Sequence, residues 1–206
     1  MKITENNLVL YIHGMGGSHT ESEHYKALFP SFDVIGLDYK TFTPWETGKE
    51  IHEAVTEFKL KYEKIILIAN SIGAFFSMNA DLYELIERAY FISPIADMEF
   101  LICNMMKFAG VTEAELEAKK VIPTSFGPDL SWEYLTYVRK HPVKWSVPVK
   151  ILYGEKDTFM PLEVISKFSQ NHNAPLTVMK GGEHWFHTQE QMKFLDDWIK
   201  SAYNFN

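Results

Sequence analysis

The sequence is poor in several features that mark particular classes of protein. It has one cysteine, Cys103, so no internal disulfide can form, which agrees with a reducing compartment. It has no block of like charge, and its 20 basic and 27 acidic residues give a formal net charge of −7. An acidic chain of this kind argues against sequence-independent binding of nucleic acid. Arg88 and Arg139 are the only arginines in the sequence, which also has 18 lysines. The scarcity of arginine weakly disfavours strongly anionic substrates.

Long apolar runs are also missing. The first run, Leu8–Ile12, ends at a His-Gly pair and is too short for a membrane span or for the core of a signal peptide. The residues before it are polar. The sequence has no internal repeat, low-complexity tract or polybasic anchor. We therefore expect a soluble, cytoplasmic protein without a membrane anchor; the sequence leaves its oligomeric state open.

Apolar residues are plentiful, and their pattern indicates the fold class. The 206 residues are 46% hydrophobic and 15% aromatic, enough for the core of one domain. Short β-rich runs alternate with segments of helical spacing, which predicts an α/β fold: a mostly parallel six-stranded sheet with helices on both faces. The expected strands are Leu8–Ile12, Asp33–Leu37, Lys64–Ala69, Ala89–Ser93, Val147–Tyr153 and Leu176–Met179.

One long segment departs from this alternation. The 49 residues from Asp97 to Trp145 carry no strand signal but contain three helical stretches, Met98–Ala109, Thr112–Lys120 and Ser131–Lys140. We expect a single domain, 1–206, with a helical cap inserted between strands at about 97–145. The alternative is a set of packing helices without a functional role.

The pentapeptide Ala69-Asn70-Ser71-Ile72-Gly73 lies where the third expected strand turns into a helix expected over Ile72–Ile86. A serine in a sharp strand-to-helix turn is strained and exposes its Oγ above the sheet, as a nucleophile must be. Small residues are needed two positions before and after it, because the two backbones nearly touch there. The alternative is an ordinary serine that caps a helix.

A glycine-rich loop, His13-Gly14-Met15-Gly16-Gly17, directly follows the first expected strand. In an acyl-transfer site this loop supplies one backbone N–H to the oxyanion, and the residue after the nucleophile supplies the other. Here those donors are Met15 and Ile72. The competing interpretation is a loop that binds dinucleotide phosphates, but the third glycine of that motif is replaced by His19.

A serine nucleophile needs a base, and the base needs a carboxylate to orient it. Of eight histidines, His184 is the candidate base, because it lies in a loop just after the last expected strand. His187 is its rival, and a metal site built on this pair is disfavoured because no cysteine or acidic cluster completes it. Asp157, which follows the strand that ends near Gly154, is the candidate acid. Other acids near strand ends are the runner-up Asp97, and Glu155 and Glu183, which we expect to be solvated.

The order Ser71, Asp157, His184, each after a different strand, resembles the α/β-hydrolase superfamily of serine hydrolases. The resemblance is carried by the four motifs around Gly14, Ser71, Asp157 and His184, and it covers the chain apart from the insertion. It implies an esterase, lipase or thioesterase-like hydrolase with Ser71 as nucleophile, Asp157 as acid, His184 as base and the Met15 and Ile72 backbones as oxyanion donors. It implies no metal or organic cofactor. Two features depart from the family: Ala69 replaces a glycine, and the two leading strands common there are missing.

The substrate is less sharply indicated. We expect Gly14 and Trp185, beside the proposed catalytic residues in sequence, and Met105 and Met106 of the insertion to contact it. These residue types suit a small or medium hydrophobic acyl group in a carboxylic ester. The alternatives are a thioesterase, an amidase or a carbon–carbon bond hydrolase with the same triad, and a non-catalytic ligand-binding protein on the same fold.

Overall fold

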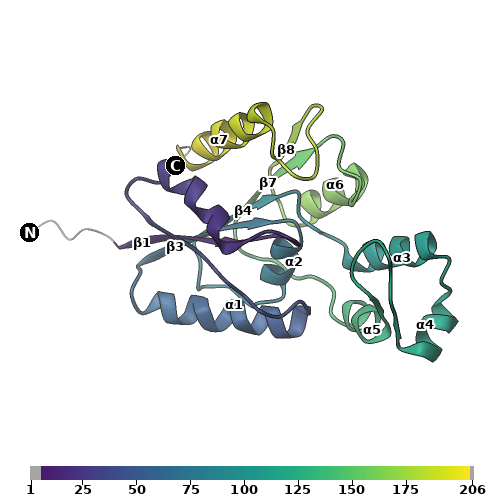
Figure 1. Cartoon of the computed structure of the whole chain (residues 1–206). Helices are drawn as coiled ribbons and strands as arrows, with labels where there is room; N and C mark the ends of the chain where they lie inside the picture. Colours follow the sequence, from purple (N-terminus) through teal and green to yellow (C-terminus); the bar gives the residue numbers. More distant parts are fainter. Residues whose placement is uncertain (1–5, 205–206) are drawn as a thin grey trace, which may run out of the picture. The chain divides into compact units, whose positions relative to one another are not determined.

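The structure is a computed structural model that describes residues 6–204 (Figure 1). The chain forms two compact units. One, which we call the sheet unit, comprises the chain up to Ala96 and again from Lys144 onward. The other, the helical unit, is Asp97–Val143. The helical unit therefore corresponds closely to the segment that the sequence sets apart as a cap; its role as a cap stays a prediction.

The sheet unit is built on six strands, each paired in parallel with its neighbours, which confirms the predicted fold class. Their order across the sheet is β2-β1-β3-β4-β7-β8. The strands are β1 (Asn7–Ile12), β2 (Asp33–Gly36), β3 (Lys64–Asn70), β4 (Arg88–Ile92), β7 (Val149–Gly154) and β8 (Leu176–Met179).

This strand order places two loops side by side. The chain leaves β1 to form β2 on one side and then returns to form β3 on the other, so the connections diverge between β1 and β3. Such a switch point, at the carboxyl ends of the strands, is where open α/β sheets bind ligands. The pairing of Ile12 with Ala69 brings the ends of both strands to the same level. The loop that begins at His13 therefore lies next to Ser71.

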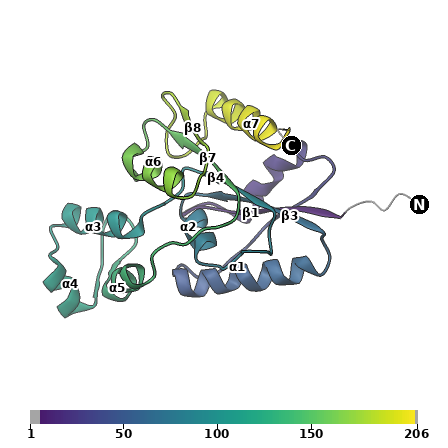
Figure 2. The same cartoon turned by 180° about the vertical axis from the view of Figure 1, so that it is seen from behind.

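Helices cover both faces of the sheet, as predicted. They are η1 (His19–Ala27, a 3-10 helix), α1 (Pro44–Lys59), α2 (Ile72–Met78), α6 (Leu162–Asn171) and α7 (Gln189–Asn204). In Figures 1 and 2, α1 and α7 lie on opposite faces of the sheet. Alternate residues of β1 show the reason: Val9 and Tyr11 enter the core shared with η1 and α7, and Leu8 and Leu10 are equally buried on the other face.

The helix after Ser71 is shorter than predicted. The apolar pattern indicates Ile72–Ile86, but α2 ends at Met78. Asn79 ends it by donating from its side chain to the Phe75 carbonyl, and Asp81 then adopts a positive φ of 48°. Leu82 and Ile86 are still buried, at 2% and 7% exposure. Their apolar spacing therefore reflects burial in a separate short turn, in which the N–H groups of Leu85 and Ile86 donate to the Leu82 carbonyl, and not a continuation of α2.

The helical unit contains α3 (Met98–Ala109), α4 (Glu113–Lys119) and α5 (Trp132–Lys140). The prediction that this segment has no strands was wrong, because β5 (Val121–Ile122) and β6 (Leu130–Ser131) form a short antiparallel pair. Two residues per strand are too few for a pattern to be visible in sequence. Arg139 of α5 ties the unit together: it donates to Glu99 of α3 at 2.7 Å and to both carboxylate oxygens of Glu113 in α4.

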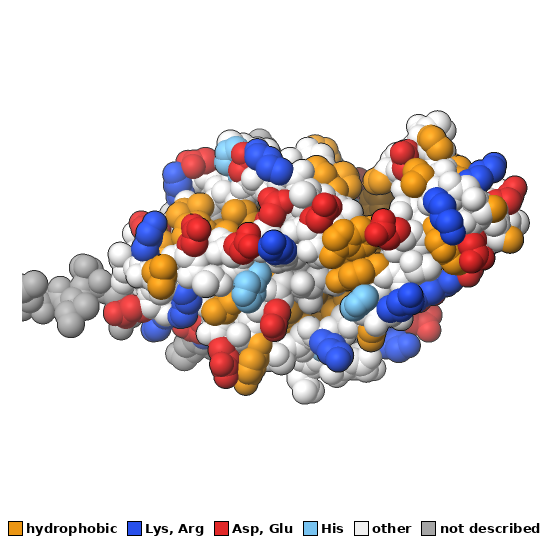
Figure 3. All heavy atoms as spheres, turned by 90° about the horizontal axis from the view of Figure 1, so that it is seen from below, with side chains coloured by type: hydrophobic (Ala, Val, Ile, Leu, Met, Phe, Trp, Pro, Cys, Tyr) orange, Lys and Arg blue, Asp and Glu red, His pale blue; other side chains and the backbone are white. Residues whose placement is uncertain are grey.

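The surface agrees with the composition. On the face that Figure 3 presents, acidic and basic side chains are interspersed with apolar ones. Among residues 6–204, no helix has the length and apolar character needed to cross a membrane.

Candidate active site

Ser71 lies at a sharp turn between β3 and α2. Its φ of 54° and ψ of −121° lie in a region that non-glycine residues rarely adopt, at a cost of about 1–3 kcal/mol. Two backbone bonds hold it there: its N–H donates to the Ile92 carbonyl at 2.9 Å, and its own carbonyl accepts from Ile95 at 3.2 Å. Its side chain makes no capping hydrogen bond to α2. The serine therefore does not act as an ordinary helix cap.

Two glycines make room for this turn. A Cβ on Gly73 would lie 2.4 Å from the His13 carbonyl oxygen, so α2 can approach the end of β1 only because this residue has no side chain. A Cβ on Gly14 would lie 3.0 Å from the Cβ of Ser71. Ala69, which departs from the family pattern, is fully buried within β3.

The imidazole of His184 reaches Ser71 from the loop between β8 and α7. Its Nε2 lies 2.8 Å from Ser71 Oγ. The loop can come this close because it crosses directly over Gly154, where a Cβ would stand 2.3 Å from the carbonyl oxygen of Glu183. The His184 side chain is 16% exposed, and the ring of Phe159 packs on it with centroids 4.6 Å apart. The imidazole is thus mostly shielded from water, and its Nε2 faces the serine.

Asp157 lies on the far side of His184, in the loop after β7. One of its carboxylate oxygens lies 2.6 Å from His184 Nδ1, and the side chain is fully buried. The other oxygen accepts hydrogen bonds from the backbone N–H groups of Phe159 and Met160, at 2.8 and 3.2 Å. Tyr153 holds this turn by donating to the Met160 carbonyl at 2.7 Å. Burial, followed by the charge of Asp157, raises the pKa of Tyr153 to about 12, so its hydroxyl stays a donor.

These contacts define which nitrogen of His184 carries the proton. A carboxylate can only accept hydrogen bonds, so the Nδ1 that faces Asp157 is protonated. In the neutral ring, Nε2 then has a free lone pair, and it accepts the hydroxyl proton of Ser71. The three side chains form one continuous hydrogen-bonded row. Such a row can transfer the serine proton to His184 while Oγ attacks an electrophile.

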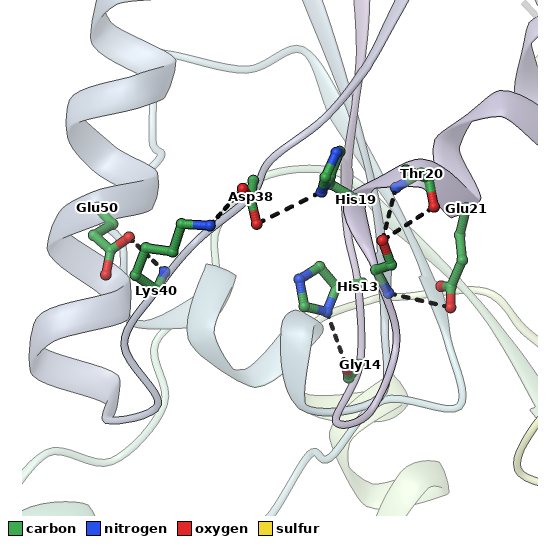
Figure 4. Close-up of polar contacts among 9 residues, drawn as sticks. His13, Gly14, His19, Thr20, Glu21, Asp38, Lys40 and Glu50 are labelled. Carbon is green, nitrogen blue, oxygen red and sulfur yellow. Dashed lines mark hydrogen bonds and ion pairs between the residues drawn. The ribbon is translucent and has the colours of Figure 1, made fainter.

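The glycine loop and the start of α2 lie next to Ser71: a Cβ on Gly14 would stand 3.7 Å from its Oγ, and Ile72 follows it directly. Within the described chain, the backbone N–H groups of Met15 and Ile72 have no hydrogen-bond acceptor. The loop runs from Gly14 to Glu21, both labelled in Figure 4. The Ser18 hydroxyl and the Glu21 carboxylate cap η1 reciprocally. Tyr11 also donates to Glu21 at 2.6 Å. The base of the loop is thereby fixed, while its tip at Met15 is 49% exposed.

The rival residues from the sequence lie elsewhere. The Nδ1 of His187 lies 2.7 Å from the Trp185 carbonyl and 3.5 Å from Glu183. Asp97 belongs to the helical unit, where it caps α3 by accepting from the Phe100 N–H at 2.9 Å.

The expected substrate residues are divided between the two units. In the sheet unit, Gly14 lies against Ser71, and Trp185, next to His184, is 66% exposed. Met105 and Met106 lie on α3 of the helical unit, with Met106 buried and Met105 half-buried. Their contact with substrate stays a prediction.

Phe159 and Tyr39 also support the candidate site, and no pattern in the sequence indicates either residue. Phe159 covers the His184 ring and binds Asp157 through its backbone, but in sequence it is only part of a turn. Tyr39 donates from its hydroxyl to the His13 carbonyl at 2.9 Å. The order of elements does not point to Tyr39, because its loop follows β2 and reaches His13 only through the parallel pairing of β1 with β2.

Solved structures resemble this chain over nearly its whole length. Est1E from Butyrivibrio proteoclasticus matches with a TM-score of 0.76 and 21% identity, over 98% of this chain and 88% of that one. Alpha/beta hydrolase domain-containing protein 10 from mouse matches with a TM-score of 0.74 and 16% identity, over 96% and 89%. The chain has the α/β-hydrolase fold. This confirms the fold that the resemblance implies.

Two further comparisons concern the sequence. No protein-family model matches the chain. A curated relative from Mycoplasma genitalium, named "Putative esterase/lipase 3", is 24% identical over 247 aligned positions, which cover 95% of this chain and 88% of that protein. In this chain, Ser71, Asp157 and His184 lie in the loops that follow the carboxyl ends of β3, β7 and β8.

Proposed function

We propose that this protein is a serine hydrolase that cleaves carboxylic esters through an acyl-enzyme. The observation that carries the proposal is the hydrogen-bonded row of Ser71, His184 and Asp157, with Oγ to Nε2 at 2.8 Å and Nδ1 to carboxylate at 2.6 Å. The strained backbone of Ser71 adds support, because such strain persists where surrounding structure maintains it for function. The name of the Mycoplasma genitalium relative agrees with ester cleavage.

The geometry suggests how the reaction proceeds. His184 takes the Ser71 proton as Oγ attacks the ester carbonyl, and Asp157 stabilises the imidazolium that forms. The oxyanion lies between the backbone N–H groups of Met15 and Ile72, each worth about 2.7–4 kcal/mol in comparable sites. His184 then protonates the departing alcohol. Water, deprotonated by the same histidine, hydrolyses the acyl-enzyme and restores Ser71.

The proposed substrate has a small or medium hydrophobic acyl group. Around Ser71, the sheet unit exposes apolar side chains at Met15 and Phe159, each 49% accessible, and at Trp185. Exposed apolar surface beside a nucleophile favours an apolar group in the substrate.

The test is turnover of p-nitrophenyl acetate and butyrate by the wild type and three variants. We expect Ser71→Ala and His184→Ala each to lose about 10³-fold or more in kcat, because each removes a member of a unit that acts together. His187→Ala is the matched control and should keep most of the activity. Equal rates for the wild type and Ser71→Ala would overturn the proposal. Loss of activity in His187→Ala, with His184→Ala active, would reassign the base.

Two measurements separate the alternatives that the sequence leaves open. A chain-length series of esters, thioesters and amides, compared by kcat/KM, identifies the preferred acyl donor. Labelling by a fluorophosphonate, located by mass spectrometry, tests for an activated serine. Absence of an adduct on Ser71 would favour a non-catalytic ligand-binding protein.

A further inference from the structure

His13 is buried directly beneath the glycine loop, at 6% exposure, yet the proposed reaction does not use it. A buried histidine next to a reaction centre needs an explanation. Its Nδ1 lies 2.9 Å from the carbonyl oxygen of Gly14, the next residue in the chain (Figure 4). A carbonyl oxygen can only accept, so Nδ1 carries the proton and donates it.

The Gly14 carbonyl shares a peptide unit with the N–H of Met15. In a planar trans peptide these two groups point in opposite directions, and residues 6–204 contain no cis peptide. The carbonyl is held by two donors, His13 Nδ1 at 2.9 Å and the Gly17 N–H at 3.1 Å. Fixing the carbonyl therefore fixes the direction of the Met15 N–H, which points away from the His13 ring.

The His13 ring is itself held in place. It stacks on Tyr39, with ring centroids 4.2 Å apart and planes 12° from parallel. The Tyr39 hydroxyl donates to the His13 carbonyl at 2.9 Å, so Tyr39 contacts both the side chain and the backbone. Glu50 of α1 anchors the loop that carries Tyr39, by accepting from the backbone N–H groups of Lys40 and Thr41. Tyr39, which stacks on the His13 ring, is thus itself held in place by α1.

We propose that His13 is a positioning residue that orients the Gly14–Met15 peptide so that the Met15 N–H stabilises the oxyanion. Gly14 is suited to this function because it approaches Ser71 closely: a Cβ there would lie 3.7 Å from Ser71 Oγ. Without the His13 donor, the peptide keeps only the Gly17 hydrogen bond and can rotate. This inference rests on the proposed hydrolase function, but its structural part, the tautomer of His13, does not.

The kinetic test compares His13→Leu with His13→Asn. The Asn amide nitrogen, bonded to Cγ as Nδ1 is, can donate to the same carbonyl, whereas Leu fills the space without a donor. We expect His13→Leu to lower kcat about 10- to 10²-fold with little change in KM, because the lost interaction belongs to the transition state. His13→Asn should recover most of that loss. His24→Leu is the matched control, because His24 bonds Asp196 at 2.6 Å, away from the loop, and should leave kcat unchanged.

A second measurement keeps the inference separate from the proposed function. Long-range ¹H–¹⁵N NMR of the wild type reports which ring nitrogen of neutral His13 is protonated. We expect the proton on Nδ1; a proton on Nε2 would overturn the inference even in an inactive protein. In an active protein, unchanged kcat in His13→Leu, or an equal loss in the Asn and Leu variants, would also overturn it. If the wild type neither turns over esters nor forms a Ser71 adduct, the proposed function fails instead.

Discussion

The close approach of α2 to β1 can be tested by adding a single methyl group. In Gly73→Ala, the new Cβ would lie 2.4 Å from the His13 carbonyl oxygen and 2.6 Å from that of Ile12. Ordinary contact begins at 3.4 Å, so the two backbones must separate by about 1 Å. Both carbonyls belong to backbone and cannot rotate away as a side chain would. Because β1 is held between β2 and β3, the helix and Ser71 must move.

This displacement should affect activity more than stability. We expect kcat/KM for p-nitrophenyl butyrate to fall about 10²-fold, since a misplacement of about 1 Å has that effect on a reaction that depends on orientation. The strain should destabilise the protein by about 1–3 kcal/mol, which lowers the melting temperature by about 2–12 °C in a chain of this size. The assay is steady-state kinetics together with thermal unfolding followed by circular dichroism.

A matched variant shows whether the methyl group itself is responsible. A Cβ added at Gly127 would have no described atom within 4 Å, so Gly127→Ala should leave kcat/KM and melting temperature close to the wild type. If Gly73→Ala retains activity within about threefold, the close packing of α2 on β1 is not what positions Ser71, and the reasoning fails.

Two further predictions concern carboxylates. Asp157→Asn should lower kcat about 10⁴-fold with little change in KM, because an amide can hold His184 in the wrong tautomer; kcat within tenfold of wild type would contradict the role given to Asp157. The hydrogen bonds from Arg139 hold the pKa of Glu113 below its usual value near 4.5, so this pair stabilises the folded state above that pH and its contribution is lost as the pH falls toward the lowered pKa. The melting temperature of the wild type should therefore decline more steeply than that of Glu113→Gln between about pH 6 and about pH 3, and parallel declines would refute this.

Much of the fold followed from local pattern. The six strands were predicted because fully buried parallel strands are continuous β-branched runs, such as that from Lys64 to Ala69. The expected helical stretch Thr112–Lys120 matches α4, whose start is set by a capping box between Thr112 and Glu115, residues only three apart. The predicted length of α2 was wrong because burial continues to Ile86, whereas Asp81 and Glu84 adopt positive φ values that interrupt the helix.

The candidate site, like the fold, could be predicted from the sequence only in part. The sequence by itself determined which residues could form it, because the chemistry of a nucleophile, a base and an acid limits the residue types, and parallel strands bring their carboxyl ends to one edge. Which histidine would meet the serine was open between His184 and His187, which are three residues apart. Only the tertiary structure decided that His184 faces Ser71 at 2.8 Å, because that contact depends on how closely the loop crosses Gly154.

The same holds for the residues that support the glycine loop. The position of His13 before the glycine loop favours a structural role for it, but the sequence does not show which groups it contacts. Its pairing with Tyr39 depends on the β1–β2 register and on a loop conformation held by Glu50, and these are contacts between residues far apart in the chain. Local sequence thus determined the strands and the candidate reactive groups. Packing between separate elements decided the direction in which each group points, because no short-range pattern encodes contacts between distant parts of the chain.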